Sequence, residues 1–257
     1  MSFSPRSVPR RAVVLGATAV VAVGAGSTLA LADGDQASPP RPKTLEQAVG
    51  DAIKAPVPAG VSARIDFTSK LPAGLAAGAP EGVASLLGGA SGRVWASGDH
   101  LRVKLAADHG SERVELVVAG RRFWAYESGS NAVVRGTLPA RATDARARGR
   151  ELSPSAVADA LAAVRRHATV SAPKPGVVGG RPAYTVTVTP RDGFVRGELS
   201  WDAERALPLR GAVYLGGGDA PVAELRASDV ELGALPASTW DVKPPAGARV
   251  TELPAHP

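Results

Sequence analysis

Apolar and polar residues alternate along most of the chain after residue 60. The first such stretch, VSARIDFT at 61–68, places apolar side chains at every second position. A period of two puts these side chains on one face of a strand, so the stretch predicts a half-buried β-strand. Similar stretches follow at the short intervals that are typical of antiparallel sheets. The later predicted strands are 93–97, 101–106, 113–118, 123–127, 132–138, 169–172, 183–189, 195–201, 209–215 and 222–232, with a last extended piece at 240–242.

Two segments have the helical period of 3.6 instead. Residues 45–53 follow Thr44, and Gln47 stands three positions after that threonine, which is the spacing of a capping box. A second helix is predicted to begin after Ser153, with Pro154 as its first residue. Two helices among many strands joined by tight turns predict the α+β class. The apolar stripe of the second helix consists of Val157, Leu161 and Val164.

Residues 71–90 depart from the rule that connecting segments are polar. This insert has a single charge, Glu81, and four leucines, which include Leu86 and Leu87. Exposed to water, it would form a large apolar patch, so we expect it to cover other apolar surface. Two interpretations stay open. The insert is either a short helix that closes the core or a lid over an apolar cavity, with its five glycines giving freedom to move.

The N-terminal residues have the layout of an export signal. Three arginines within the first 11 residues precede the uncharged run 12–32, which ends in Ala-Leu-Ala. This predicts a signal peptide at 1–32, cleaved after Ala32. Because the uncharged run is long enough to span a bilayer, a retained membrane anchor is the alternative. Residues 33–43 contain three prolines and predict an extended linker, so the folded domain is expected at 44–257.

The charge balance argues against nucleic acid as a partner. The formal net charge is +6 and the isoelectric point is about 10.0. However, three of the basic residues lie in the predicted signal peptide, which has no acidic residue, so the rest of the chain carries only +3. An exported chain with nearly balanced charge does not have the basic footprint of a nucleic-acid-binding protein.

The sequence contains no recognisable catalytic or metal-binding motif. Cysteine is absent, which excludes disulfides, thiolate metal sites, a cysteine nucleophile and a lipid anchor on cysteine. The four histidines do not have metal-ligand spacing, and no G-x-S-x-G nucleophile elbow occurs. We therefore predict a non-catalytic protein without a cofactor or a metal ion, with an exported hydrolase as the distant alternative.

Five short motifs follow one another in a recognisable order. They are RVWASGDHLRV at 93–103, FWAYES at 123–128, GRPAY at 180–184, WDAERALPLR at 201–210 and WDVKPPAGA at 240–248. In order and spacing they resemble the bacterial lipoprotein-carrier superfamily with the LolA/LolB-like fold. That superfamily also includes the RseB/MucB amino-terminal domain and the LppX/LprG lipid-binding lipoproteins. The chain differs from the LppX/LprG group in having no lipobox cysteine.

The resemblance implies a strongly curved antiparallel sheet, an incomplete β-barrel, with helices packed on its concave side. It also implies an apolar cavity for acyl chains between the sheet and the helices. A closed core is the alternative, because alternation shows which face is apolar and not whether that face encloses a space. The candidate lipid-binding residues that would line the cavity are Ile65, Phe67, Leu86, Leu87, Leu101, Val103, Leu105, Val114, Leu116 and Val118.

Two functions follow from this resemblance as expectations. The first is an extracytoplasmic, non-catalytic carrier or binder of lipids or lipoprotein acyl chains, secreted or held at the outer face of the cytoplasmic membrane. The second is an RseB/MucB-like envelope-stress regulatory module that binds a membrane anti-sigma factor. The expected partners are therefore acyl chains and a membrane protein. Burial of a methylene group contributes about 0.8 kcal/mol, so acyl-chain binding needs apolar area and no charged motif.

Overall fold

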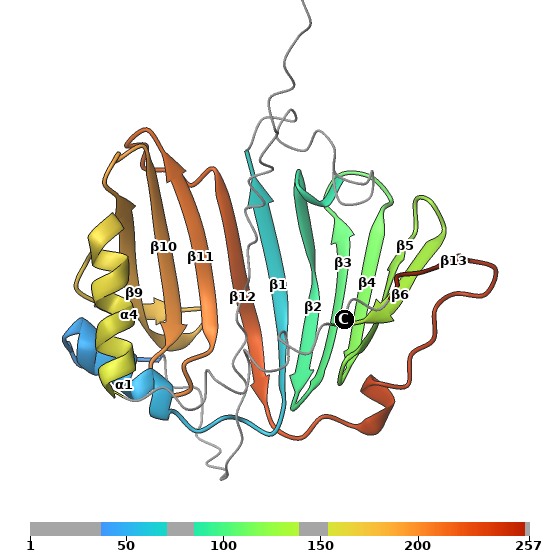
Figure 1. The fold of residues 1–257 in the computed structure, drawn as a ribbon, viewed down its shortest axis with the longest axis horizontal. Helices are drawn as coiled ribbons and strands as arrows, with labels where there is room; N and C mark the ends of the chain where they lie inside the picture. The colour runs from blue at the N-terminus through green and yellow to red at the C-terminus, as the bar shows by residue number, and fades with distance from the viewer. Residues whose placement is uncertain (1–36, 71–84, 139–153, 255–257) are drawn as a thin grey trace, which may run out of the picture.

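The computed structural model describes residues 37–70, 85–138 and 154–254, which form one broad sheet with helices at one end (Figure 1). The helices within these ranges are α1 (Leu45–Lys54), α4 (Pro154–His167) and the 3-10 helix η2 (Ala237–Thr239). The strands are β1 (Val61–Ser69), β2 (Gly89–Ser97), β3 (His100–Ala107), β4 (Arg113–Ala119), β5 (Arg122–Glu127), β6 (Ala132–Thr137), β7 (Ala168–Val170), β8 (Lys174–Val178), β9 (Arg181–Pro190), β10 (Val195–Asp202), β11 (Pro208–Leu215), β12 (Ala223–Leu232) and β13 (Arg249–Glu252).

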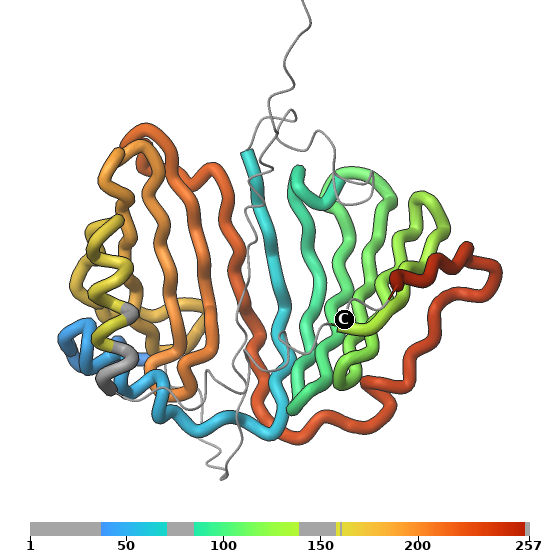
Figure 2. Tube along the Cα trace, in the orientation of Figure 1, coloured from blue at the N-terminus to red at the C-terminus, as the bar shows by residue number. Residues whose placement is uncertain are grey.

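The sheet consists of two antiparallel meanders that meet at one strand pair. Strands β1 to β6 lie side by side in chain order, and β9 to β12 do the same (Figure 2). β12 pairs antiparallel with β1, with Leu225 opposite Phe67, and so joins the two halves. The order is β13-β6-β5-β4-β3-β2-β1-β12-β11-β10-β9-β7, and β8 also pairs with β9. Because β13 and β7 stand at opposite ends of this order, the sheet stays unclosed.

The pairing register gives the sheet one apolar and one polar face. Residues directly opposite each other in neighbouring strands point to the same side. Ile65 is opposite Ala227 on β12 and Gly92 on β2, and Gly92 is in turn opposite Leu105 on β3. We call the side that carries Ile65 the apolar face. The opposite side, which carries Arg64, is the polar face.

Helix α1 begins with the predicted capping box. The Thr44 hydroxyl accepts a hydrogen bond from the backbone N–H of Gln47 at 3.2 Å, and the Gln47 side chain accepts one from the backbone N–H of Thr44 at 3.0 Å. These bonds satisfy N–H groups that have no partner within the helix. The first turn of α1 is thereby fixed, and with it the direction of the helix face that carries Leu45.

Both helices pack against one end of the apolar face. Side chains of the helices meet aromatic side chains of β9 and β10 there, and the rings of Tyr184 and Trp201 lie 6.1 Å apart. Figure 1 shows α1 and α4 beside this end of the sheet, away from β1 to β6. The helices therefore cover only part of the apolar face. The core cluster contains Leu45, Ala48, Tyr184, Val186 and Trp201, with Leu161 of α4 packed against it.

The C-terminal segment after β12 crosses the polar face. The Trp240 ring lies 5.2 Å from the ring of His100 on β3, and Arg102 Nη1 donates to the carbonyl oxygen of Thr239 at 3.1 Å. The chain then returns to β6, with which β13 pairs in parallel. The predicted extended piece at 240–242 was therefore wrong. Side-chain contacts hold this segment on β3, and the last strand comes later, at β13.

The α+β class with a curved, unclosed antiparallel sheet is confirmed. The differences are shifted element boundaries and two strands that were not predicted, β8 and β13. The insert ends earlier than predicted, because β2 already begins at Gly89. Strand β8 was missed, since Pro175 and Gly176 interrupt its apolar pattern. Residues 71–84 of the insert and the predicted signal peptide lie outside the described residues.

Candidate functional site

Eight of the ten candidate lining residues project from the apolar face. Ile65 and Phe67 lie on it from β1, and the six candidates of β3 and β4 form direct cross-strand pairs. Leu86 and Leu87 precede β2, and Leu87 is 36% exposed. The structure therefore brings the strand candidates together on one surface. The pairs are Leu101 with Val118, Val103 with Leu116, and Leu105 with Val114.

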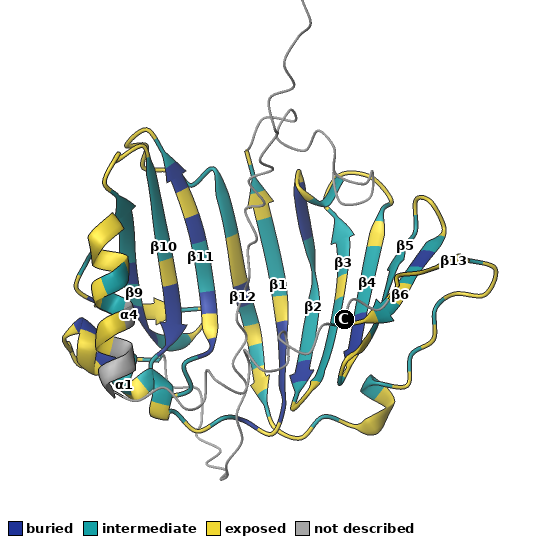
Figure 3. Cartoon of the chain, viewed as in Figure 1, coloured by how far each residue is buried: buried dark blue, intermediate teal, exposed yellow. Residues whose placement is uncertain are grey.

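The apolar face continues over β10, β11 and β12, which contain none of the ten candidate residues. Leu199 of β10, Val213 of β11 and Leu225 of β12 are 48%, 38% and 41% exposed. Leu225 is directly opposite Phe67, so this exposed area is continuous with the predicted set. Figure 3 shows exposed positions along these strands, next to the end that the helices bury. The sequence pattern could have identified Leu199 and Val213 as residues of this face, since 195–201 and 209–215 alternate in the same way as 61–68.

A glycine separates the two exposed leucines. Leu199 and Leu225 are each directly opposite Gly211, which lies on the strand between them. Among the described residues, no heavy atom lies within 4 Å of a Cβ atom built on Gly211. The missing side chain therefore leaves open space between two apolar side chains. We call this open strip, formed by Leu199, Gly211 and Leu225, the glycine trough.

An ion-pair network on the polar face lies directly behind the glycine trough. Arg210 Nη1 donates to Glu198 Oε2 at 2.8 Å, and its Nε donates to Glu224 Oε1 at 2.5 Å. The Tyr214 hydroxyl donates to Glu198 Oε2 at 2.8 Å. Burial is the largest single effect and raises the pKa of both carboxyls. The hydrogen bonds and positive charges around them, from Arg210 and Tyr214 on Glu198 and from Arg210 and Arg226 on Glu224, together hold each pKa below its ordinary value. This network links β10, β11 and β12 across the back of the trough.

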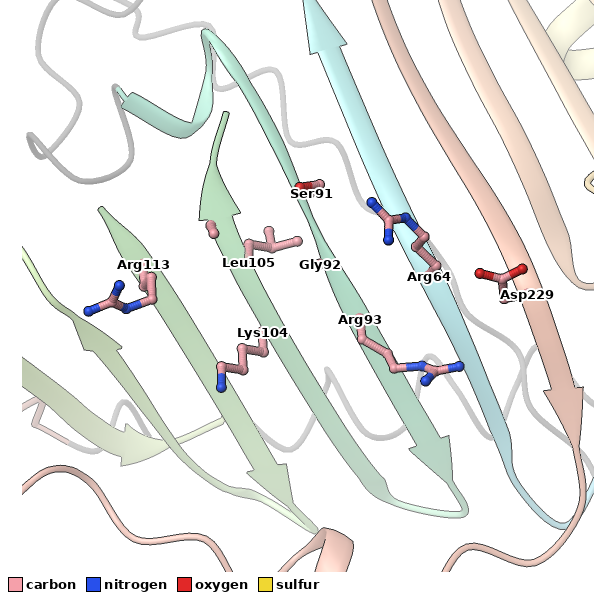
Figure 4. Close-up of a pocket in the computed structure, with 9 residues that line it drawn as sticks. Arg64, Ser91, Gly92, Arg93, Lys104, Leu105, Arg113 and Asp229 are labelled. Carbon is pink, nitrogen blue, oxygen red and sulfur yellow. The ribbon is translucent and has the colours of Figure 1, made fainter. Parts of the chain in front are cut away.

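A hollow of about 350 Å³ lies on the polar face of β1 to β4. Of the ten candidates, only Leu105 lines it. Most of its other side chains are basic, and Figure 4 shows them spread over neighbouring strands. A second hollow lies where the N-terminus of α1 meets the C-terminal part of α4 and the segment after β7, and is lined by Leu45, Arg165 and Val170, among others.

The described residues contain neither a cluster of metal-binding side chains nor a membrane-spanning helix. No group of three or more His, Asp or Glu side chains in 37–70, 85–138 and 154–254 could hold a metal ion. In the same ranges, no helix is long and apolar enough to cross a membrane.

No protein-family profile and no curated protein matches the chain. Solved structures do match it. An uncharacterized conserved protein from Thermus thermophilus is 13% identical with a TM-score of 0.49, and the match covers 81% of this chain and 98% of that protein. A LolA superfamily protein from Nitrosomonas europaea is 13% identical with a TM-score of 0.27, and the match covers 78% of this chain and 98% of the other.

MucB is similar as well. One MucB structure is 20% identical with a TM-score of 0.46 and covers 79% of this chain, and a second shows MucB in complex with the periplasmic part of MucA at 18% identity. A MucA/MucB complex from Pseudomonas aeruginosa also matches. The chain spans about three fifths of the length of MucB, between 60% and 64%.

Proposed function

We propose that this protein is a non-catalytic binder of lipids or lipoprotein acyl chains, which lie along the apolar face. The observation that carries the proposal is the exposed apolar area of Leu199, Val213 and Leu225, continuous with Phe67. Contiguous apolar surface that is open to water marks a binding site more often than it occurs without a partner. The eight strand candidates extend this surface to β3 and β4.

The shape of the surface suits a hydrocarbon chain. The glycine trough offers open space between two leucine side chains, where a chain of methylene groups can lie against apolar atoms on both sides. About 15 methylenes, at about 0.8 kcal/mol each, would gain roughly 12 kcal/mol before the costs of association and ordering are subtracted. Association and ordering remove several kcal/mol of this gain, and none of the gain requires a charged recognition group.

We place this activity outside the cytoplasm, on the basis of the export signal expected at residues 1–32. In the regulatory alternative, the same surface binds a protein segment instead of an acyl chain. In that case the apolar face would hold an apolar segment of a membrane anti-sigma factor. A lipid and a protein segment are distinguished by what the purified protein carries and by what displaces it.

Identification of bound lipid tests the proposal. The full chain is purified from cell envelopes without added lipid, and its mass is measured under native conditions before and after denaturation. We expect a bound species that is released on denaturation and contains acyl chains. Affinity is then measured by displacement of a fluorescent fatty acid from the delipidated protein.

A matched pair of valine substitutions locates the site. Val213→Glu puts a charge on the exposed part of the apolar face, whereas Val250→Glu puts the same charge on β13, where Val250 is 52% exposed and opposite Val133 on the other face. We expect V213E to weaken fatty-acid binding at least about tenfold, because a carboxylate beside a methylene chain loses its hydration, and V250E to leave it unchanged. Equal binding by both variants, or a protein that carries no lipid, overturns the proposal. Capture of an apolar peptide without lipid favours the regulatory alternative.

A further inference from the structure

Three basic residues stand in one register row on the polar face. Arg64 of β1 is directly opposite Arg93 of β2, and Arg93 is directly opposite Lys104 of β3. Side chains paired in this way start about 5 Å apart, and like charges in such pairs destabilise a sheet. The row therefore destabilises the folded protein when no anion is bound. Its presence suggests that these residues have a role in binding.

The row forms one side of the hollow of about 350 Å³. Ser91 and Ala106, which are directly opposite each other in the next register row, give the hollow a floor of small side chains. Arg113 of β4 continues this second row, because it is opposite Ala106. Figure 4 shows the four basic residues on four adjacent strands around Ser91 and Gly92. The hollow is thus lined by four basic side chains and one hydroxyl.

The carboxylates near the hollow leave part of this charge free. Asp229, the acidic residue that lines it, sits in a β-bulge of β12 with a φ of 47°. Asp66 lies 3.3 Å from Arg64, and Glu231 lies 3.7 Å from Arg93. Glu115, opposite Lys104, is bound by Arg102 at 2.7 Å.

Three donor groups remain without a partner within the described part of the chain. The Nε atom of Arg93 is buried and makes no hydrogen bond. The side chains of Lys104 and Arg113 have neither an ion pair nor a hydrogen bond there. A buried donor left unpaired destabilises the folded protein, and an anion in the hollow would remove this penalty by accepting the hydrogen bond.

We propose that this hollow binds a phosphate group, with Arg93, Lys104 and Arg113 as its principal donors. Phosphate oxygens accept several charge-assisted hydrogen bonds at once, which suits guanidinium and ammonium groups arranged around a small floor. The site faces away from the glycine trough, so it is a second site and not the headgroup pocket of a chain bound there. The phosphate belongs either to the headgroup of an anionic lipid at a membrane surface or to a free phosphate compound.

Two double variants of equal charge test the site. Lys104→Gln/Arg113→Gln removes the two unpaired cations of the hollow. Arg122→Gln/Lys174→Gln removes two exposed cations from the polar face outside it, since Arg122 and Lys174 lie opposite Thr137 and Thr185. The full-length protein and both variants are titrated with inorganic phosphate by calorimetry at about 0.15 M salt, where long-range attraction is screened. Sedimentation with vesicles of phosphatidylcholine, alone or with phosphatidylglycerol, follows.

We expect the hollow variant to bind inorganic phosphate at least about tenfold more weakly than the control variant, because it lacks two donors of charge-assisted hydrogen bonds. If the same variant also loses binding to phosphatidylglycerol vesicles, the phosphate is that of a lipid headgroup. If vesicles do not bind but phosphate does, the ligand is a free phosphate compound. Equal binding by the two variants, or no phosphate binding by the unaltered protein, overturns the proposal. Lipid bound to the apolar face is measured in a separate experiment, so the results can contradict the phosphate site and the proposed function independently.

Discussion

Leu199 on β10 and Leu225 on β12 flank the same open space, because each is directly opposite Gly211 on the strand between them. Both leucines are nearly half exposed, and no heavy atom of residues 37–70, 85–138 or 154–254 lies within 4 Å of the position a Gly211 side chain would take. In an ordinary sheet core such a gap is closed by a packed helix or a second sheet. In the described part of the chain, α1 and α4 pack against β9 and β10 instead.

Filling this gap should block the proposed ligand without unfolding the sheet. Gly211→Phe places a ring between the two leucines, and we expect fatty-acid affinity to fall at least about tenfold while the melting temperature is kept or raised, since the ring buries apolar area. Displacement of a fluorescent fatty acid and thermal unfolding measure the two effects.

Gly176→Phe is the control for that substitution. Gly176 lies on β8 opposite Ala183, on the polar face, and likewise has no heavy atom within 4 Å of its Cβ position. It should bind fatty acid like the unaltered protein. Loss of binding in both variants would show that the ring acts through the fold and not through the glycine trough.

Alternation along the sequence was sufficient to predict most strands and the side of the sheet on which Ile65 and Phe67 lie. It was not sufficient to predict that Leu199 stays exposed while Trp201, two residues later on the same face, is 9% exposed. That difference depends on where α1 and α4 pack, which is a non-local result of the fold. The sequence pattern of a strand determines which face is apolar. Whether other elements bury that face depends on segments that are distant in the sequence.

The cationic hollow could not be predicted from the sequence for a related reason. Arg64, Arg93 and Lys104 lie far apart along the chain and form no charge run. They become neighbours only through the register of β1, β2 and β3. A shift of one residue in either pairing would place one of them on the apolar face.

Acid should destabilise the protein partly through Glu198 and Glu224. Their pKa values are below the ordinary value of 4.5 in the folded protein. Burial, the largest single effect, opposes this, but the hydrogen bonds and charges of Arg210, with Tyr214 at Glu198 and Arg226 at Glu224, together outweigh it. Such groups contribute stability above the unfolded pKa and lose it as the pH falls through the lowered folded pKa. We expect Glu198→Gln to be less stable at pH 7 by about 1 kcal/mol and to lose less melting temperature between pH 5 and pH 3.

The exposed pair of Arg135 and Glu252 provides the comparison for that pH profile. Glu252 is 62% exposed, so solvent screens its interaction and Glu252→Gln should change neither the stability at pH 7 nor the pH profile. Thermal unfolding followed by circular dichroism at several pH values measures both. Parallel profiles for the two variants would contradict the assigned role of the Arg210 network.

Asp202 should be among the most sensitive positions of the sheet. Its side chain is 1% exposed, pairs with Arg181, and accepts the backbone N–H groups of Glu204 and Arg205 at 2.8 and 2.7 Å. Asp202→Ala leaves these donors unpaired in the turn between β10 and β11, at an expected cost of about 2–4 kcal/mol. Chemical denaturation measures the cost. The neighbouring exposed Glu204, replaced by alanine, should change stability by less than about 0.5 kcal/mol, and a similar loss in both would contradict this account.

Gly92 and Gly211 lie on the same face of the sheet but should respond in opposite ways to alanine. A Cβ on Gly92 would lie 1.9 Å from the carbonyl oxygen of Lys104 and 2.9 Å from Leu105 Cα, so β2 and β3 would have to separate. Backbone atoms cannot move aside as a flexible side chain can, and we expect Gly92→Ala to cost about 1–3 kcal/mol. Gly211→Ala meets no atom within 4 Å and should be neutral or stabilising by up to about 1 kcal/mol, because alanine restricts the unfolded chain. Equal unfolding free energies for the two variants would mean that β2 and β3 do not approach each other closely at Gly92.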